Sequence, residues 1–151
     1  MTKLGEAIKN AKRVYLAGNG GSAANAIHIA NDLISCGVRA YALTADVATL
    51  TAIANDYDYS VVFSRQLRVF GEKGDLLIVL SGSGKSSNIV AALNAAKEIG
   101  MESWAIVGMS GGPARDLADN NIYYAGSTMQ EAEQEQLRIG HSLLAELKEK
   151  K

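Results

Sequence analysis

Several residue types are scarce in this 151-residue chain, and each shortage excludes a class of protein. The single cysteine, Cys36, excludes an internal disulfide and suits a reducing compartment. Lys and Arg number 15 against 16 Asp and Glu, so no basic excess indicates a nucleic-acid binder. No apolar run approaches the roughly 18 residues of a membrane span, and the first residues lack the apolar core of a signal peptide. We therefore expect a cytoplasmic protein with neither a nucleic-acid nor a membrane partner.

The length and the apolar pattern predict one compact α/β domain over residues 1–151. Five short apolar runs are predicted as strands, at residues 13–17, 39–43, 75–80, 102–107 and 121–124. Amphipathic stretches between them are predicted as helices, at residues 2–12, 22–36, 46–55, 60–70, 86–99, 113–118 and 130–150. Because the strands are apolar throughout and alternate with helices, we predict a three-layer α/β/α sandwich around a five-stranded parallel sheet.

The first strand leads into a glycine-rich turn, Gly18-Asn19-Gly20-Gly21-Ser22, which opens a helix. Glycines let a backbone approach a bulky anion, and the free N–H groups of a helix start favour negative charge, so we predict a phosphate or sugar site. His28 and Asp32 follow at i and i+4 on one face of the same helix, where they suit proton chemistry or a metal, although a solvated surface pair has the same spacing. The turn also fits the dinucleotide pattern G-x-G-x-x-A, but the second strand ends in Thr44-Ala45 rather than in the acidic residue that a ribose requires.

A second loop of small polar residues, Ser81-Gly82-Ser83-Gly84-Lys85-Ser86-Ser87, lies between the third predicted strand and a helix. Its Gly84-Lys85-Ser86 is reminiscent of a nucleotide-binding P-loop, but Val79 stands where that motif needs its first glycine. Four hydroxyls beside flexible glycines and a helix start suit a phosphate monoester, although an ordinary capped turn has some of the same features.

Several further short motifs accompany these loops along the chain. They are Ala54-Asn55-Asp56-Tyr57, Phe63-Ser64-Arg65-Gln66, Gly74-Asp75 and Ile139-Gly140-His141. In this order, and together with the two loops, His28 and Asp32, they resemble the sugar isomerase (SIS) domain over residues 14–147, and within it the phosphoheptose isomerase family. The resemblance implies the flavodoxin-like form of the sandwich, an aldose–ketose isomerase acting on sedoheptulose 7-phosphate, a zinc ion, and a homo-oligomer, either tetramer or dimer.

The resemblance also implies roles for individual residues. The sugar would be lined by Asn19, Gly20, Gly21 and Ser22, and its hydroxyls contacted by Asn55 and Asp56. The phosphate would be held by Ser81, Gly82, Ser83 and Ser86, with Glu133 a further substrate-binding residue. The zinc ligands would be His28, Asp32, Glu133 and His141. Asp32 would move the carbon proton through an enediol, with His141 as its partner acid and base.

Two of these positions depart from the family pattern. Asp32 replaces a glutamate, and Glu133 replaces a glutamine. Helical spacing offers Gln134, seven residues before His141, as an alternative to Glu133. An alternative function follows from these departures, because the superfamily also includes non-catalytic proteins that bind sugar phosphates or associate with a replication initiator.

Overall fold

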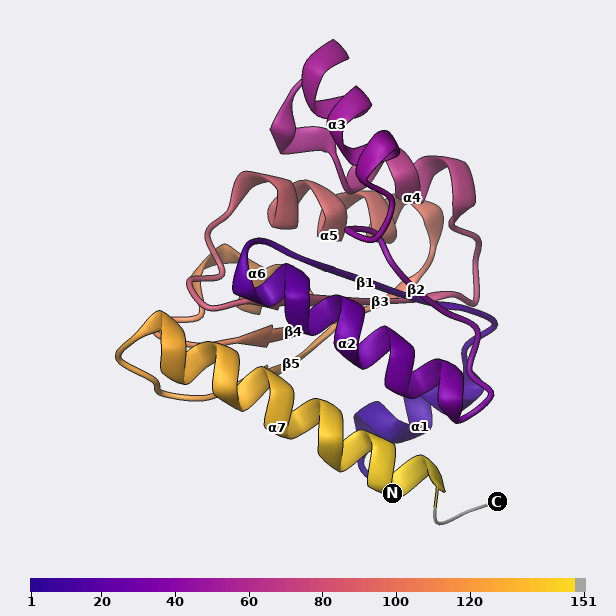
Figure 1. Cartoon of the computed structure of the whole chain (residues 1–151), viewed down its shortest axis with the longest axis vertical. Helices are drawn as coiled ribbons and strands as arrows, with labels where there is room; N and C mark the ends of the chain where they lie inside the picture. Colours follow the sequence, from indigo (N-terminus) through magenta and orange to yellow (C-terminus); the bar gives the residue numbers. More distant parts are fainter. Residues whose placement is uncertain (149–151) are drawn as a thin grey trace.

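The computed structural model describes residues 1–148, in which five parallel strands form one sheet between two layers of helices (Figure 1). The strands are β1 Val14–Gly18, β2 Ala40–Ala42, β3 Leu76–Ser81, β4 Glu102–Val107 and β5 Asn120–Tyr123. Their order across the sheet is β2-β1-β3-β4-β5, with every neighbouring pair parallel. The predicted sandwich and its five parallel strands are confirmed.

The helices cover both faces of the sheet, and alternate side chains of the buried strands join the core on one face or the other (Figure 1). They are α1 Lys3–Asn10, α2 Gly21–Ser35, α3 Val47–Asp56, α4 Ser64–Phe70, α5 Ser87–Ile99, α6 Gly112–Leu117 and α7 Met129–Lys148. Leu16 and Ile78 pack in the core with α1, α2 and α7, whereas Leu77 and Val79 pack in the core with α4, α5 and α6. The predicted end of the last helix, at residue 150, lies outside the described residues.

Local signals set several helix ends where the sequence predicts them. Asp46 accepts a hydrogen bond from the N–H of Thr49 at 3.2 Å and begins α3, and Gly100 ends α5 in the left-handed region at φ 88°. The predicted helix at residues 60–70 is instead broken into a 3₁₀ turn, Tyr59–Val61, and α4. Asp58 accepts from the N–H of Ser60 at 2.9 Å and so starts the turn. Within residues 1–148, no helix is both long and apolar enough to cross a bilayer.

The topology brings the two glycine- and serine-rich loops together. β1 and β3 are neighbours, with Gly18 beside Leu80, and each strand runs directly into its loop. The chain order reverses between these two strands, because β2 lies outside β1 and β4 lies outside β3. Ligands of open parallel sheets bind at such a switch point, beyond the carboxyl ends of the strands.

Candidate functional site

The first loop turns tightly between β1 and α2 because glycine is required at its start. A Cβ on Gly18 would lie 2.7 Å from the carbonyl oxygen of Ser22, too close for any other residue. Gly20 has φ 56°, and a Cβ there would meet no atom within 4 Å, so its backbone faces open space. This open backbone at the start of α2 is suited to close approach by a ligand.

Asn19 is fixed by three hydrogen bonds within the protein. Its amide nitrogen donates to Asn88 Oδ1 at 2.8 Å, and its Oδ1 accepts from Asn88 Nδ2 at 2.9 Å and from the Tyr59 hydroxyl at 2.8 Å. Both lone pairs of the Asn19 oxygen are therefore occupied, which leaves one N–H for a ligand. The sequence prediction for Asn19 missed Asn88 and Tyr59, which tie the first loop to α5 and to the 3₁₀ turn.

Ser22 is held from the opposite side by α7. Gln136 is fully buried, donates to Ser22 Oγ at 3.0 Å, and accepts from Asn25 Nδ2 at 3.0 Å. Asn25 also donates to the backbone carbonyl of Glu133 at 2.9 Å. Because Ser22 accepts the bond from Gln136, its own proton stays available to a ligand. The sequence analysis missed Gln136 and Asn25, although a polar residue on the inner face of α7 was the signal to look for.

The second loop presents its hydroxyls around the start of α5. Ser81 Oγ accepts from the N–H of Gly84 at 2.9 Å, and Ser83 Oγ accepts from the N–H of Lys85 at 3.2 Å. Ser86 occupies the N-cap of α5 but makes no capping bond with its side chain. All three hydroxyl protons can therefore turn toward an anion at the N-terminus of a 13-residue helix.

Three titratable side chains meet where α2 contacts α7. His28 Nε2 lies 3.1 Å from His141 Nε2 and 3.4 Å from Asp32 Oδ2, and one ligand atom from each of the three lies within 4.8 Å of the others. Two ligands of a tetrahedral ion at about 2.0–2.1 Å stand about 3.3 Å apart, so these spacings suit a shared ion. Asp32 Oδ2 is buried and accepts no hydrogen bond from residues 1–148, so a cation beside it would compensate its charge. The three residues therefore fit a divalent metal ion.

Gly140 allows the contact that brings the histidines together. A Cβ at Gly140 would lie 2.5 Å from Ile29 Cγ1 and 2.9 Å from Ile29 Cδ1. Any larger residue would push α7 away from α2 at the position next to His141. Gly140 therefore sets the helix spacing on which the contact between His28 and His141 depends.

Glu133 is not brought to this metal group. Its carboxylate lies against Gly21, where it covers the space that a Cβ would take. Gln134 lines a shallow cavity of about 530 Å³ on the outer side of α7 together with His141. Of the four predicted metal ligands, the structure groups His28, Asp32 and His141, and it places Glu133 at the first loop.

Asn55 and Asp56 lie at the end of α3, shortly before Tyr59, whose hydroxyl donates to Asn19 of the first loop. Both are exposed at the end of α3, and Asn55 Nδ2 donates to Asp56 Oδ1 at 3.0 Å. The nearby Arg65 guanidinium lies 3.5 Å above the centre of the Tyr57 ring. In Figure 1, α3 stands at the far side of the molecule from α7. Their contact with the sugar stays a prediction.

Comparison with known proteins gives this geometry a family. Residues 2–108 match the SIS domain. The phosphoheptose isomerase of Nitratiruptor sp. is 41% identical over 144 residues, which cover 91% of this chain and 77% of that protein. The phosphoheptose isomerase of Burkholderia pseudomallei is 44% identical over 140 residues, covering 89% of this chain and 71% of that protein.

A solved structure agrees with these sequence matches. The structure of phosphoheptose isomerase from Neisseria gonorrhoeae superposes with a TM-score of 0.91 at 32% identity, covering 97% of this chain and 81% of that one. The fold, the two loops at the switch point and the sequence identity over most of both chains all indicate the same family. The chain therefore belongs to the SIS-domain family and, within it, to the phosphoheptose isomerases.

Proposed function

We propose that this enzyme interconverts a ketose and an aldose phosphate, taking sedoheptulose 7-phosphate to D-glycero-D-manno-heptose 7-phosphate through an enediol. The observation that carries the proposal is the grouping of His28 and Asp32, on the helix that begins at the first loop, with His141 of α7. Ser22 and His28 are six residues apart on α2, or about 9 Å along the helix axis, a span on the scale of an extended sugar phosphate. The phosphoheptose isomerases to which the chain is similar support the choice of substrate.

The phosphate group is assigned to the second loop. The hydroxyls of Ser81, Ser83 and Ser86 each retain a proton to donate, and the start of α5 adds free N–H groups. Gly82 belongs to the same phosphate loop, and its missing side chain leaves room for Met129 at the start of α7, since a Cβ there would lie 2.8 Å from the Met129 Sδ. The sugar then extends over Gly20 and toward α2.

The sugar itself is assigned to the first loop and its neighbours. The free N–H of Asn19, the open backbone of Gly20 and the Ser22 hydroxyl supply donors to its oxygens. Gly21 lines the sugar in the same turn, beneath the Glu133 carboxylate. The Glu133 carboxylate against Gly21 accepts from a sugar hydroxyl at the same place. Asn55 and Asp56 would contact further hydroxyls of the sugar from the end of α3.

The proton transfers are assigned to Asp32 and His141. The Asp32 carboxylate takes the proton from C1 of the ketose, and the resulting enediol receives it back at C2 to give the aldose. His141 moves the second proton, taking one from the C1 oxygen and giving one to the C2 oxygen. Asp32 suits the role of base because its Oδ2 is buried and unsatisfied, so its charge is not dispersed by hydrogen bonds.

The metal site is assigned to zinc, held by His28, Asp32 and His141. Two imidazoles and a carboxylate form a ligand set that zinc uses in catalytic sites, where a fourth position stays open. A bound zinc ion would supply Lewis-acid stabilisation of negative charge on the sugar oxygens. Zinc loading and base catalysis both draw on Asp32 and His141, so metal content must be measured together with activity.

The test is turnover of sedoheptulose 7-phosphate by the purified, metal-analysed protein. The Asp32→Asn and His141→Ala variants should each lose about 10²- to 10⁴-fold in kcat. The matched control is Ser142→Ala. Ser142 is the exposed neighbour of His141, and its hydroxyl donates to the carbonyl of Arg138 at 3.0 Å, so this variant should keep full activity. If both site variants keep wild-type turnover, the assigned residues are wrong. If the wild type has no turnover but the sugar phosphate raises its melting temperature, the protein is a binding module.

We also infer that the enzyme is a homo-oligomer. Ile27 and Ile34 on α2 are 45% and 56% exposed, and Leu137 lines the shallow cavity beside His141. A second copy over this layer would remove these apolar side chains from water. Light scattering should give a dimer or tetramer that Ile34→Glu weakens, and a monomeric wild type would refute the inference. The single cysteine suits a reducing compartment, and we place the enzyme in the cytoplasm.

A further inference from the structure

A second cavity lies at the other end of the sheet from the two loops. It has a volume of about 420 Å³, within the range of small-molecule sites, and it opens where β1 and β2 begin. We call it the Arg–Tyr pocket. Its lining residues are Arg13, Tyr15, Arg39, Ala40, Tyr41 and Phe70.

Two arginines stand next to each other in the Arg–Tyr pocket. β1 and β2 pair in parallel with Val14 beside Ala40 and Tyr15 beside Tyr41, so the same register places Arg13 beside Arg39. The sequences Arg-Val-Tyr and Arg-Ala-Tyr thus present matching side chains on one face of adjacent strands. Like charges at directly opposite positions destabilise a sheet, unless an anion lies between them.

The charge of this pair is not neutralised by close acidic groups. Among the described residues, neither arginine has a carboxylate within the 4.0 Å of an ion pair. The hydrogen bond of Arg13 with Tyr15 raises the pKa of its guanidinium, and Glu72 and Asp75 act on it from a greater distance. Arg39 is exposed at the edge of the sheet. An anion with several oxygens would satisfy both guanidinium groups at once.

Aromatic rings form the remaining walls of the Arg–Tyr pocket. The Tyr15 hydroxyl donates to the carbonyl of Phe70 at 3.1 Å, which joins β1 to the end of α4. Tyr41 and Phe70 are 38% and 49% exposed, an uncommon exposure for two large rings in one cavity. Exposed rings of this kind bind flat apolar groups by stacking.

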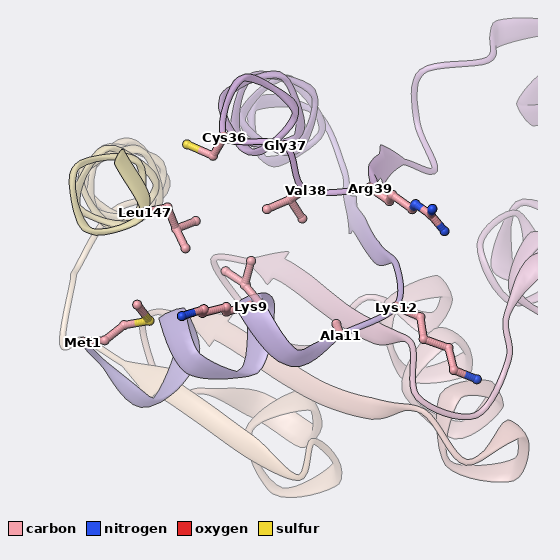
Figure 2. A pocket seen from close by; sticks show the side chains of 10 residues that line it. Met1, Lys9, Ala11, Lys12, Cys36, Gly37, Val38, Arg39 and Leu147 are labelled. Atoms are coloured by element: carbon pink, nitrogen blue, oxygen red, sulfur yellow. The ribbon is translucent and has the colours of Figure 1, made fainter. Parts of the chain in front are cut away.

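A neighbouring cavity shows which way the cations point. That cavity, about 380 Å³ between α1, the end of α2 and α7, has Lys12 and Arg39 on its rim. Figure 2 shows that both side chains turn away from it, while Lys9 and Cys36 point into it. The Arg39 side chain therefore points away from this cavity, which leaves its guanidinium available to bind a ligand in the Arg–Tyr pocket.

We propose that the Arg–Tyr pocket binds a nucleoside monophosphate, with the phosphate between Arg13 and Arg39 and the base against Tyr41 and Phe70. The paired guanidinium groups would bind the phosphate, and the exposed rings would stack on a flat base. The site is separate from the proposed catalytic residues, because it lies where strands β1 and β2 begin, whereas the loops follow the ends of β1 and β3. The proposal does not depend on the identity of the sugar substrate.

The test is calorimetric titration of the full chain with AMP, GMP, CMP and UMP at low ionic strength. Saturating sedoheptulose 7-phosphate keeps the catalytic loops occupied, and adenosine and inorganic phosphate are titrated separately. We expect at least one nucleotide to bind at least tenfold more tightly than either adenosine or phosphate. Arg39→Gln and Tyr41→Ala should each weaken it at least tenfold, while Lys9→Gln in the neighbouring cavity should not. Isomerase turnover of Arg39→Gln should equal that of the wild type.

A second measurement distinguishes a binding pair from a structural one. Without a ligand, Arg39→Gln should raise the melting temperature slightly at low salt, and the gain should vanish at high salt, because it removes a like-charge neighbour. A fall in melting temperature would show that Arg39 is structural and would overturn the proposal. Absence of nucleotide binding would overturn it as well. A change in oligomeric state in Arg39→Gln or Tyr41→Ala would assign this surface to contact between copies instead.

Discussion

Replacing Gly140 by alanine tests whether the contact between α2 and α7 is what holds the two histidines together. The added Cβ would lie 2.5 Å from Ile29 Cγ1, whereas ordinary carbon contacts are about 3.5–4.0 Å. Relief of the overlap requires the two helices to separate locally by about 1 Å. The 3.1 Å distance between the Nε2 atoms of His28 and His141 would then grow to about 4 Å, beyond the span of two ligands on one ion.

The expected effect on stability is small compared with the effect on the site. Alanine gains about 1 kcal/mol over glycine in a helix interior, whereas overpacking costs about 1–3 kcal/mol. The net loss of unfolding free energy is therefore at most about 2 kcal/mol. Zinc affinity should fall about 10- to 100-fold, the loss seen when support around metal ligands is disturbed. The kcat for sedoheptulose 7-phosphate should fall with it, because His141 moves away from Asp32.

A compensating variant makes this test sharp. Ile29→Ala removes both atoms that the new Cβ would overlap and leaves Ile29 Cβ at 3.7 Å, an ordinary contact. Ile29→Ala alone costs about 2–5 kcal/mol through the cavity it creates, which the methyl group of Gly140→Ala partly fills. The double variant should therefore recover most of the zinc affinity and turnover. Zinc affinity is measured by competition with a chelator, and stability by urea unfolding. Wild-type zinc affinity in Gly140→Ala, or no recovery in the double variant, would refute the assigned role of this glycine.

Three further predictions concern buried polar groups and the loops. Gln136→Leu leaves Ser22 and Asn25 without their buried partner and should cost about 1–3 kcal/mol in urea unfolding; an unchanged midpoint would contradict this. Gly84→Ala forces a side chain onto a residue at φ 66° packed against backbone, and should cost more than about 1 kcal/mol in thermal unfolding while weakening sugar-phosphate binding in calorimetry. Burial raises the pKa of Tyr124 to about 12 from an ordinary value near 10. The stabilisation from this neutral phenol is thus complete below pH ~10 and lost as pH rises to ~12. The melting temperature of Tyr124→Phe should therefore fall less than that of the wild type over that interval.

The sheet and its loops were predictable because their signals are local. Apolar runs mark each strand, and Gly18 marks the tight turn that no other residue can make. Parallel pairing then places successive loops at one edge of the sheet, so their adjacency follows from topology. The pairing of Asn19 with Asn88 was not predictable in this way, because 69 residues separate them and an asparagine in a loop has many roles.

The placement of Glu133 shows the limit of spacing arguments on a helix. At 3.6 residues per turn, a residue eight positions before His141 is rotated about 80° from it, and one seven positions before about 20°. Gln134 therefore shares the face of His141, and Glu133 lies partly round the helix, where α7 passes the first loop. A shift of one position along α7 therefore separates a residue that faces the metal group from one that faces the first loop.

The assembled site divides binding and chemistry between two parts of the fold. The phosphate donors belong to the loop between β3 and α5, whereas His28, Asp32 and His141 belong to the contact between α2 and α7. The last helix supplies His141 to the metal group and Gln136 to the first loop, so both depend on how α7 packs. Asp32 lies 3.4 Å from His28 on α2 itself, whereas His141 reaches this pair from α7, where Gly140 allows the two helices to approach. Helix spacing, rather than side-chain length alone, therefore determines whether the acid and base groups meet.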